Sequence, residues 1–524
     1  MDLEEVLKKK TYYEKEIYGS VRYEQTEDES FYADDFLVPQ IKKPIKVMRT
    51  GKARRLIDGP AAQIVTSNPQ AYRRPLKENP TEVEADKRIV NYVNHIILPS
   101  MKMSNPNRFR EFVKKQLLRG EGWIQTLHNS RWVENQGNDK DPVFDRNGSP
   151  LIFRITDPMI TFASPEEDCN GVPEDIFLVY DRHFNTIQNV YPEWKNSKNR
   201  NEKKPFTKWW EYWDKNHRIF CVDDEIVFEG ENPYGFVPFV HKVAGFGTES
   251  YDGKMEDFIV GRLRFSRDTL VRQCAMVSSM DYSIHTFANR SIDVQPVDDR
   301  HQIPDDFANK YEIGTGLIHE LPAGIEVRRS VEELPEVQLF QYMRDIDIQL
   351  DLEDPLAGSL PIGGSGRQQD MSVSMALRKY DSVIENTEHA FATAIGQGLQ
   401  MLDKVPKLRP DEIKKDDFRD NYELIVDLKA SDPLENDRLA TLGSRMLSQG
   451  EIDPITNLVD FKGYLREDAH KIMNRKLAWD VIFNDPDIRA FLGFKGIEKS
   501  GMASEMAEFR ASTGSAPTQA PITQ

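Results

Sequence analysis

The segment from Lys254 to Ala288 has the sequence KMEDFIVGRLRFSRDTLVRQCAMVSSMDYSIHTFA. Apolar side chains recur in it every seven residues, at Leu263, Leu270, Val277 and Ile284. Because this spacing keeps side chains on one face of a helix, the pattern predicts a single helix over 254–288. At 1.5 Å per residue it would be a rod of roughly 50 Å, too long for an ordinary domain core. A core helix of a multidomain enzyme and a helix held by neighbouring subunits both remain open.

A second long helix is predicted from Asp370 to the residue before Pro406. Asp370 suits an N-cap, and the apolar positions after it keep the helical period, at Val373, Leu377, Tyr380, Ile384, Phe391, Ile395 and Leu402. Gly396 and Gly398 inside this helix indicate either a kink or a close contact. Before it lies LPIGGSG at 360–366, which is not a phosphate-binding loop because no Gly-Lys-Ser/Thr follows.

The segment 335–354 fits two structures. It alternates like a strand over its acidic part, but Leu339, Met343, Ile346 and Leu350 also form a helical face. Residues 336–369 carry six acids and two arginines, a net charge of −4.

The amino-acid composition limits the classes of protein to which this chain can belong. The 524 residues, 39% of them hydrophobic, suffice for several domains. No apolar run reaches about 18 residues, so no membrane span is expected, and the charged N-terminus does not resemble a signal peptide. Three scattered cysteines indicate a reducing compartment and neither a disulfide framework nor a zinc site.

The formal net charge of −17 is unlike that of proteins that grip nucleic acid by neutralising phosphates. Simple solubility is one explanation. The charge therefore argues against tight gripping of DNA without excluding DNA as a partner.

The N-terminal half is predicted to be α+β. Helices are expected over 2–18, 54–66, 80–98 and 108–118, and antiparallel strands over 123–127, 151–155, 176–180, 209–213, 218–222 and 225–229. The polar segment 20–43 would either wrap a neighbouring subunit or be a disordered end. Trp209, Trp210, Tyr212 and Trp213 would form either a base-stacking platform or, as we favour, buried alternate rings of a sheet.

Further along, strands are predicted over 316–321, 325–329 and 422–428, and helices over 434–447, 454–461, 465–472 and 476–483. The segment 289–334 holds ten acids against five arginines and lysines. The spacing of Asp299, His301, Asp305 and Asp306 matches no calcium or zinc loop. We therefore predict no metal site and no cofactor.

No motif of an ATPase, metalloprotease or serine hydrolase is present, so we predict no catalytic residue and no enzyme activity. A nuclease-type, nucleic-acid-processing enzyme with domain-bridging helices stays as an alternative.

Three motifs together resemble the portal protein of tailed double-stranded DNA bacteriophages of the siphophage and myophage type. They are ARRLIDGPAAQ at 53–63, NPYGFVPFVH at 232–241 and SMALRKY at 374–380. The resemblance covers roughly residues 50–480 and rests on the order of the motifs. Ser374 stands where that family often has Gly.

The resemblance implies a multidomain α+β portal fold with long stem and wing helices around a central channel. It divides the chain into an N-terminal arm and wing (1–253), a first stem helix (254–288), a clip (289–334), a second stem helix (335–352), a tunnel loop (353–369), a long wing helix and closing strand (370–430), a helical crown (431–510) and a disordered tail (511–524). The resemblance therefore favours a helix over 335–352.

The resemblance also implies site residues. The tunnel loop would contribute Glu353, Asp354, Leu356, Ser359, Gly363, Gly364, Ser365, Arg367 and Gln368. The channel-facing side of the stem would carry Asp345, Asp347 and Asp351. The clip would offer Asp298, Asp299, Asp305 and Asp306 for docking.

The implied partners are further copies of the chain in a dodecamer, duplex DNA passing without sequence specificity, the large terminase subunit, the major capsid and scaffolding proteins, and the head-tail adaptor, with no membrane. The implied location is the portal vertex of the virion, reached through assembly in the host cytoplasm. Another head-tail connector ring is a weaker alternative.

Overall fold

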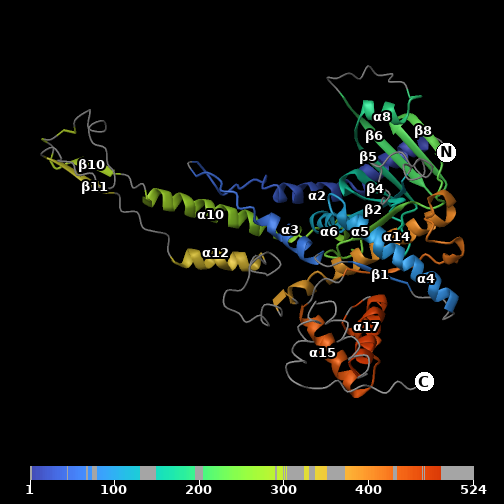
Figure 1. Cartoon of the computed structure of the whole chain (residues 1–524). Coiled ribbons are helices and arrows are strands. Elements are labelled where there is room, and N and C mark those ends of the chain that lie inside the picture. Colours follow the sequence, from blue (N-terminus) through green and yellow to red (C-terminus); the bar gives the residue numbers. More distant parts are fainter. Residues whose placement is uncertain are drawn as a thin grey trace, which may run out of the picture. The chain divides into compact units, whose positions relative to one another are not determined.

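The computed structural model describes residues 3–43, 45–65, 69–73, 80–129, 149–194, 205–288, 292–298, 300, 302–303, 324–329, 337–350, 372–373, 375–428, 433–462, 464 and 466–484. The chain divides into two compact units, Met1–Asp432 and Pro433–Gln524, which are described separately. The first mixes helices and sheets, as predicted, and the described part of the second is helical (Figure 1).

A five-stranded antiparallel sheet forms one part of the first unit. Its order is β4-β5-β6-β7-β8, with the bounds β4 Thr161–Ala163, β5 Asp175–His183, β6 Phe206–Asp214, β7 His217–Val222 and β8 Glu225–Glu231. The predicted strands in this region are thus confirmed. The short helices η3 (Pro158–Ile160) and α8 (Phe184–Val190) flank β4 and β5.

The aromatic residues of β6 alternate between the two faces of this sheet. Trp209 and Trp213 belong to the main core, whereas Trp210 and Tyr212 pack into a second core on the opposite face. All four are at most 3% exposed, so the buried interpretation is confirmed and the stacking platform was wrong.

The N-terminal helices cover the second face of the sheet. They are α1 (Leu3–Tyr12), the π-helix η1 (Tyr13–Ile17) and α2 (Gly19–Tyr32). Val6, Tyr13, Tyr18 and Val21 are buried against it. Residues 20–32 are therefore a helix packed within their own chain, and both interpretations of 20–43 as an arm were wrong for this part.

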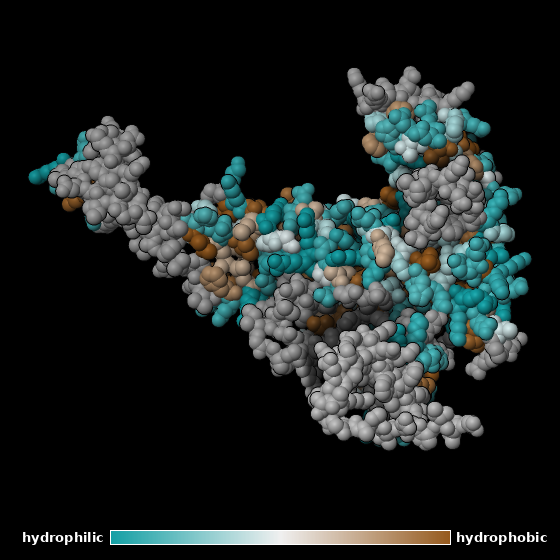
Figure 2. Space-filling view, in the orientation of Figure 1, coloured by the Kyte–Doolittle hydropathy of each residue, from teal (hydrophilic) through white to brown (hydrophobic). Residues whose placement is uncertain are grey.

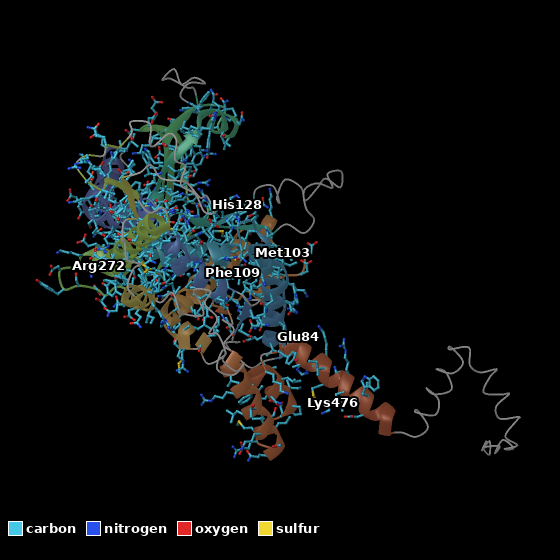
Figure 3. The ribbon with its side chains drawn as sticks, turned by 90° about the vertical axis from the view of Figure 1, so that its left-hand side faces the viewer. Glu84, Met103, Phe109, His128, Arg272 and Lys476 are labelled. Atoms are coloured by element: carbon cyan, nitrogen blue, oxygen red, sulfur yellow. The ribbon has the colours of Figure 1, made fainter. Side chains whose placement is uncertain are left out.

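The first unit also contains a second, three-stranded antiparallel sheet. Its order is β3-β2-β9, with β2 Glu121–His128, β3 Leu151–Thr156 and β9 Phe239–Val243. The helix α6 (Arg108–Arg119) packs on it. Asn107 caps α6 by accepting bonds from the backbone of the first turn, and Gly120 ends it at φ 82°. Phe109 of α6 lies inside the body (Figure 3).

The remaining helices before residue 130 are α3 (Lys52–Ile64), α4 (Pro80–Tyr92), η2 (Val93–Ile97) and α5 (Leu98–Met103). They agree with the predicted helices over 54–66 and 80–98. The strand β1 (Gln70–Tyr72) pairs with β12 (Ile425–Asp427), the short core of the strand predicted over 422–428.

The first long helix is shorter than predicted. The structure has α9 (Met255–Phe258), η4 (Arg264–Ser266) and α10 (Arg267–Ala288). Between them, Arg262 N donates to Leu117 O at 2.7 Å, and a Cβ on Gly261 would lie 2.5 Å from Leu118 O. The chain is thus held against the end of α6, which overrides the helical period.

The second long helix also begins late. Residues 372–373 and 375–378 are helical, a turn follows at 379–380, and α14 runs from Asp381 to Lys404. Gly396 and Gly398 mark close contacts rather than a kink. A Cβ on Gly396 would lie 2.7 Å from Tyr422 O, and one on Gly398 2.6 Å from Leu151 Cδ1. The short helices η6 (Pro406–Leu408) and η7 (Lys415–Asp417) follow α14.

The ambiguous segment forms a helix, α12 (Val337–Gln349), and the predicted strand over 325–329 is β11 (Ile325–Arg329), paired with β10 (Ile292–Pro296). The strand predicted over 316–321, the tunnel loop 353–369, Ser374 and the tail 511–524 lie outside the described residues.

The second unit contains α15 (Pro433–Gln449), α16 (Pro454–Thr456), η8 (Asn457–Phe461) and α17 (Arg466–Asn484). The helices predicted over 465–472 and 476–483 are one continuous helix. Lys476, labelled in Figure 3, lies on its exposed surface.

Candidate functional site

The helices α10 and α12 lie side by side (Figure 1). Leu270 and Cys274 of α10 share a buried core with Ile346 of α12 and with Leu350, which directly follows that helix. Asp347 Oδ1 accepts bonds from Lys52 Nζ at 2.5 Å and from Gln273 Nε2 at 3.3 Å. These contacts fix the two helices to each other and to α3 at one end of the pair.

Both helices also expose apolar side chains, most of them toward the opposite ends. Every side chain from Asp281 to His285 on α10 is exposed. The exposed large apolar residues of the pair are Tyr282, Ile284, Leu339, Phe340, Tyr342 and Ile348, each between 39% and 51% exposed. Figure 2 shows this hydrophobic surface over α10 and α12. We call these six residues the apolar stem patch. Exposed apolar side chains gathered on one helix pair are a candidate interaction surface.

The predicted site residues are only partly described. Asp345 is exposed on α12, whereas the Asp347 carboxylate is engaged by Lys52 and Gln273 within the chain. Asp298 is exposed and accepts a bond from Arg300 N at 3.1 Å. Asp351, the tunnel-loop residues Glu353 to Gln368, Asp299, Asp305 and Asp306 lie outside the described residues. Channel-facing and docking roles for these residues stay predictions.

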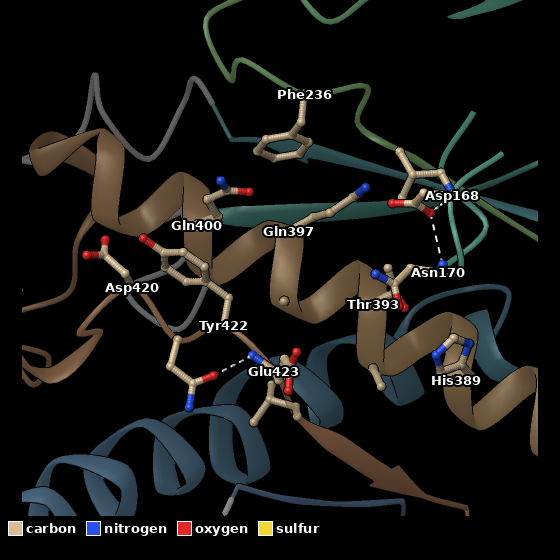
Figure 4. A pocket seen from close by; sticks show the side chains of 15 residues that line it. Asp168, Asn170, Phe236, His389, Thr393, Gln397, Gln400, Asp420, Tyr422 and Glu423 are labelled. Atoms are coloured by element: carbon tan, nitrogen blue, oxygen red, sulfur yellow. Dashed lines mark hydrogen bonds between the residues drawn. The ribbon is translucent and has the colours of Figure 1, made fainter. Parts of the chain in front are cut away.

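A groove of about 780 Å³ runs along α14 (Figure 4). Its walls come from three further segments, namely the turn at 168–172, the segment around Phe236 and residues 420–424. Asp168, Asp420 and Glu423 contribute carboxylates, and the lining includes no lysine or arginine. Burial and the nearby Lys242 lower the pKa of His389, so this ring does not offset those charges near neutral pH.

A buried ionic cluster connects α2 to the three-stranded sheet. Glu121, on β2, binds Arg22 and accepts from His241 Nε2 at 3.0 Å, and His241 Nδ1 lies 2.6 Å from Glu167. Burial opposes the charge on His241, but Glu167 and Glu121 outweigh it and raise its pKa to about 9. Burial would raise the pKa of Glu121, yet Arg22 and His241 hold it well below its usual range. The carboxylate of Glu121 and both ring nitrogens of His241 have partners within the chain, so we interpret this cluster as structural.

Two features escaped the sequence reasoning. The groove is assembled from four separated segments, and no local pattern could reveal it. The second is a basic stretch: between Phe36 and Ile57 there are seven lysines and arginines and no acid, in a chain of net charge −17. That asymmetry was visible in the sequence.

Within the described part of the chain, no group of three His, Cys, Asp or Glu side chains is placed to hold a metal ion. Among the same residues, no helix is both long and apolar enough to span a membrane.

No protein-family model and no curated protein matches the chain. Among solved structures, one titled "Neck of empty GTA particle computed with C6 symmetry" matches with a TM-score of 0.43 and 9% sequence identity, over 79% of this chain and 90% of that one. A likeness at this level does not by itself establish a shared fold.

Proposed function

We propose that this chain is a portal subunit, of which copies form a ring, a dodecamer by resemblance, around a channel for viral double-stranded DNA. The ring would occupy the portal vertex of the virion after assembly in the host cytoplasm, and DNA would pass through it during packaging and ejection. The chain itself would carry no catalytic residue. ATP hydrolysis would belong to the terminase motor.

The apolar stem patch carries this proposal. Six large apolar side chains on α10 and α12, five of them toward the outer ends, are between 39% and 51% exposed. A neighbouring copy of the same helix pair would bury them, because packed helices cover one another's apolar faces. The order of elements adds support, since the three motifs fall on α3, on the approach to β9 and on the turn before α14.

The excess of acidic residues supports a channel through which DNA slides rather than a surface that binds DNA tightly. The chain has 86 acids against 69 lysines and arginines. A channel with this balance would repel a duplex and let it slide, since few phosphate contacts would have to break. The clip residues Asp298, Asp299, Asp305 and Asp306 would dock the terminase motor and later the head-tail adaptor, and the rest of the ring would contact capsid and scaffolding proteins.

Negative-stain electron microscopy with mass photometry tests the proposal. We expect rings with a channel of roughly 20 Å or more, wide enough for B-DNA. Phe340→Asp should weaken each contact between copies by about 1.5–3 kcal/mol, which is about ten- to hundredfold in affinity. Phe206→Asp, at a phenylalanine that is 64% exposed on β6, is the matched control and should leave assembly unchanged.

The tunnel loop gives a second test. Single cysteines introduced at 353–369 should cross-link neighbouring subunits around the axis if this segment lines the channel. A chain that stays monomeric at micromolar concentration and cleaves DNA with added magnesium would instead favour the nuclease alternative.

A further inference from the structure

Four cations are grouped in the segment 42–49, which precedes α3. Lys42, Lys43, Lys46 and Arg49, which we call the basic strip, are all exposed, and none forms an ion pair with a carboxylate within the described residues. The segment that carries them is fixed at its end. Met48 N donates to Ser278 Oγ at 2.8 Å, Cys274 Sγ contacts Met48 O at 3.0 Å, and Thr50 binds Gln273 at 3.2 Å. The strip is therefore held in place without being neutralised.

The groove along α14 has the opposite chemistry. Its carboxylates at Asp168, Asp420 and Glu423 form no ion pair within the described residues. Lys242 acts electrostatically on Asp168 but does not line the groove.

One buried group in the groove wall lacks a partner. Gln397 is 7% exposed, and its Nε2 donates to Val237 O at 3.2 Å and Phe239 O at 3.4 Å. Its Oε1 is buried with no hydrogen-bond partner. A buried carbonyl oxygen without a donor costs about 1–3 kcal/mol.

A ring constrains where such an occupant comes from. In a cyclic assembly of more than two copies, each interface joins one surface of a subunit to a different surface of the next. The strip carries four positive charges and the groove three negative ones, on separate surfaces of the same chain. We propose that the basic strip of one copy docks into the α14 groove of the next copy. This inference rests on the proposed ring.

The basic strip and the α14 groove also match in their hydrogen-bonding groups. Lysine ammonium and arginine guanidinium groups are donors only, and the groove offers carboxylate and carboxamide oxygens as acceptors. The volume of about 780 Å³ lies within the roughly 300–1,000 Å³ of ordinary binding pockets. The exposed Val47 and Met48 beside the strip would meet the apolar part of the wall at Val172 and Phe236.

Charge reversal tests the pairing by mass photometry. The strip variant Lys42→Glu/Lys43→Glu/Lys46→Glu should raise the concentration for half-assembly at least tenfold, and so should the groove variant Asp420→Lys/Glu423→Lys. Combining the two should restore assembly to within about threefold of wild type. The control Lys8→Glu/Lys15→Glu/Lys208→Glu makes the same charge change at other exposed lysines and should have no effect.

The results separate the two proposals. A strip variant that assembles like its control, or a combined variant that is not restored, would overturn the pairing while the wild-type ring leaves the proposed function intact. A wild-type chain without any oligomer would overturn both.

A native cysteine offers an independent check. Cys169 is exposed between the groove residues Asp168 and Asn170. Under mild oxidation of the assembled protein, Lys46→Cys should give a ladder of disulfide-linked oligomers, and adding Cys169→Ser should abolish it. Lys208→Cys should give no ladder. A ladder that survives Cys169→Ser would count against the docking geometry.

Discussion

Four side chains hold the carboxylate of Glu121. Its fully buried carboxylate binds Arg22, His241, Gln25 at 2.8 Å and Trp123 Nε1 at 3.0 Å. Glu121→Gln removes the carboxylate that pairs with the buried Arg22 and leaves His241 with Glu167 as its remaining counter-charge. We expect the free energy of unfolding of this unit to fall by about 3–5 kcal/mol. Urea unfolding followed by tryptophan fluorescence measures this.

An exposed ion pair provides the comparison for Glu121. Glu111 pairs with Arg108 at 3.0 Å one helical turn away, with both side chains partly exposed. Glu111→Gln should cost no more than about 0.5 kcal/mol because solvent screens such pairs. Equal losses of unfolding free energy at the two positions would show that the contacts of Glu121 contribute no more than an exposed ion pair.

The stability of the same cluster should depend on pH. The pKa of His241 is raised from 6.5 to about 9 in the folded chain. A raised pKa stabilises the fold fully below the unfolded value, and this stability is lost as pH rises through about 9. Between pH 7.5 and 9.5 the wild-type urea midpoint should fall more steeply than that of His241→Gln. Burial raises the pKa of Glu388 to about 7 and that of Asp28 to about 6, so both titrate below this window.

At the scale of one helix, α14 depends on the close approach that Gly396 allows. Alanine is the better helix former by about 1 kcal/mol, but its Cβ at this position would lie 2.7 Å from the Tyr422 carbonyl. Gly396→Ala should therefore lower the melting temperature. Gly19→Ala, where the nearest atom is 3.8 Å away, should leave it unchanged or raise it. The same direction of change in both variants would refute the packing argument.

Local periodicity predicted most elements because each buries one face. Alternation in β6 placed its aromatic rings correctly, and the stop at Gly120 ended α6. The periodicity gave the wrong prediction over 254–266, where Gly261 packs on the last turn of α6. This contact joins segments that are distant in sequence, so no local pattern contains it. The periodicity also failed at α2, whose buried Arg22, Gln25 and Asp28 made a packed helix look like a polar arm.

The candidate sites, too, could be predicted only in part from the sequence. The apolar character of 282–284 and 339–348 was visible along the chain, but only the pairing of α10 and α12 shows that these side chains share an uncovered surface. Asp347 illustrates the limit, since its partner Lys52 is 295 positions away in sequence. The tunnel-loop and most clip predictions fall outside the described residues and stay predictions.

For the whole molecule, the division at Asp432 suggests that the first unit folds alone. Among the residues that the structure describes, its three buried cores contain none after Leu428. A chain of residues 1–432 should show a cooperative thermal transition within a few degrees of the corresponding transition of the full chain. Calorimetry of both chains tests this, and a shortened chain without a transition would show that the second unit is required.

The last fourteen residues, 511–524, are small, polar and rich in Pro and Thr. Such a composition cannot bury a core. Deleting them should leave ring assembly unchanged in electron micrographs and mass photometry. A truncated chain that no longer assembles would assign the tail a direct role between copies.

The cover of the five-stranded sheet by α1 and α2 has a consequence for biosynthesis. Tyr13 binds Asp175 across 162 positions of sequence, so the N-terminal helices leave the ribosome long before the strands they cover. At about 5–20 residues per second, the delay is about 8–30 s. During that time Val6, Tyr13 and Tyr18 have no sheet to pack against. The apolar side chains of α1 and α2 therefore stay exposed in the growing chain until the strands of the sheet have been synthesised.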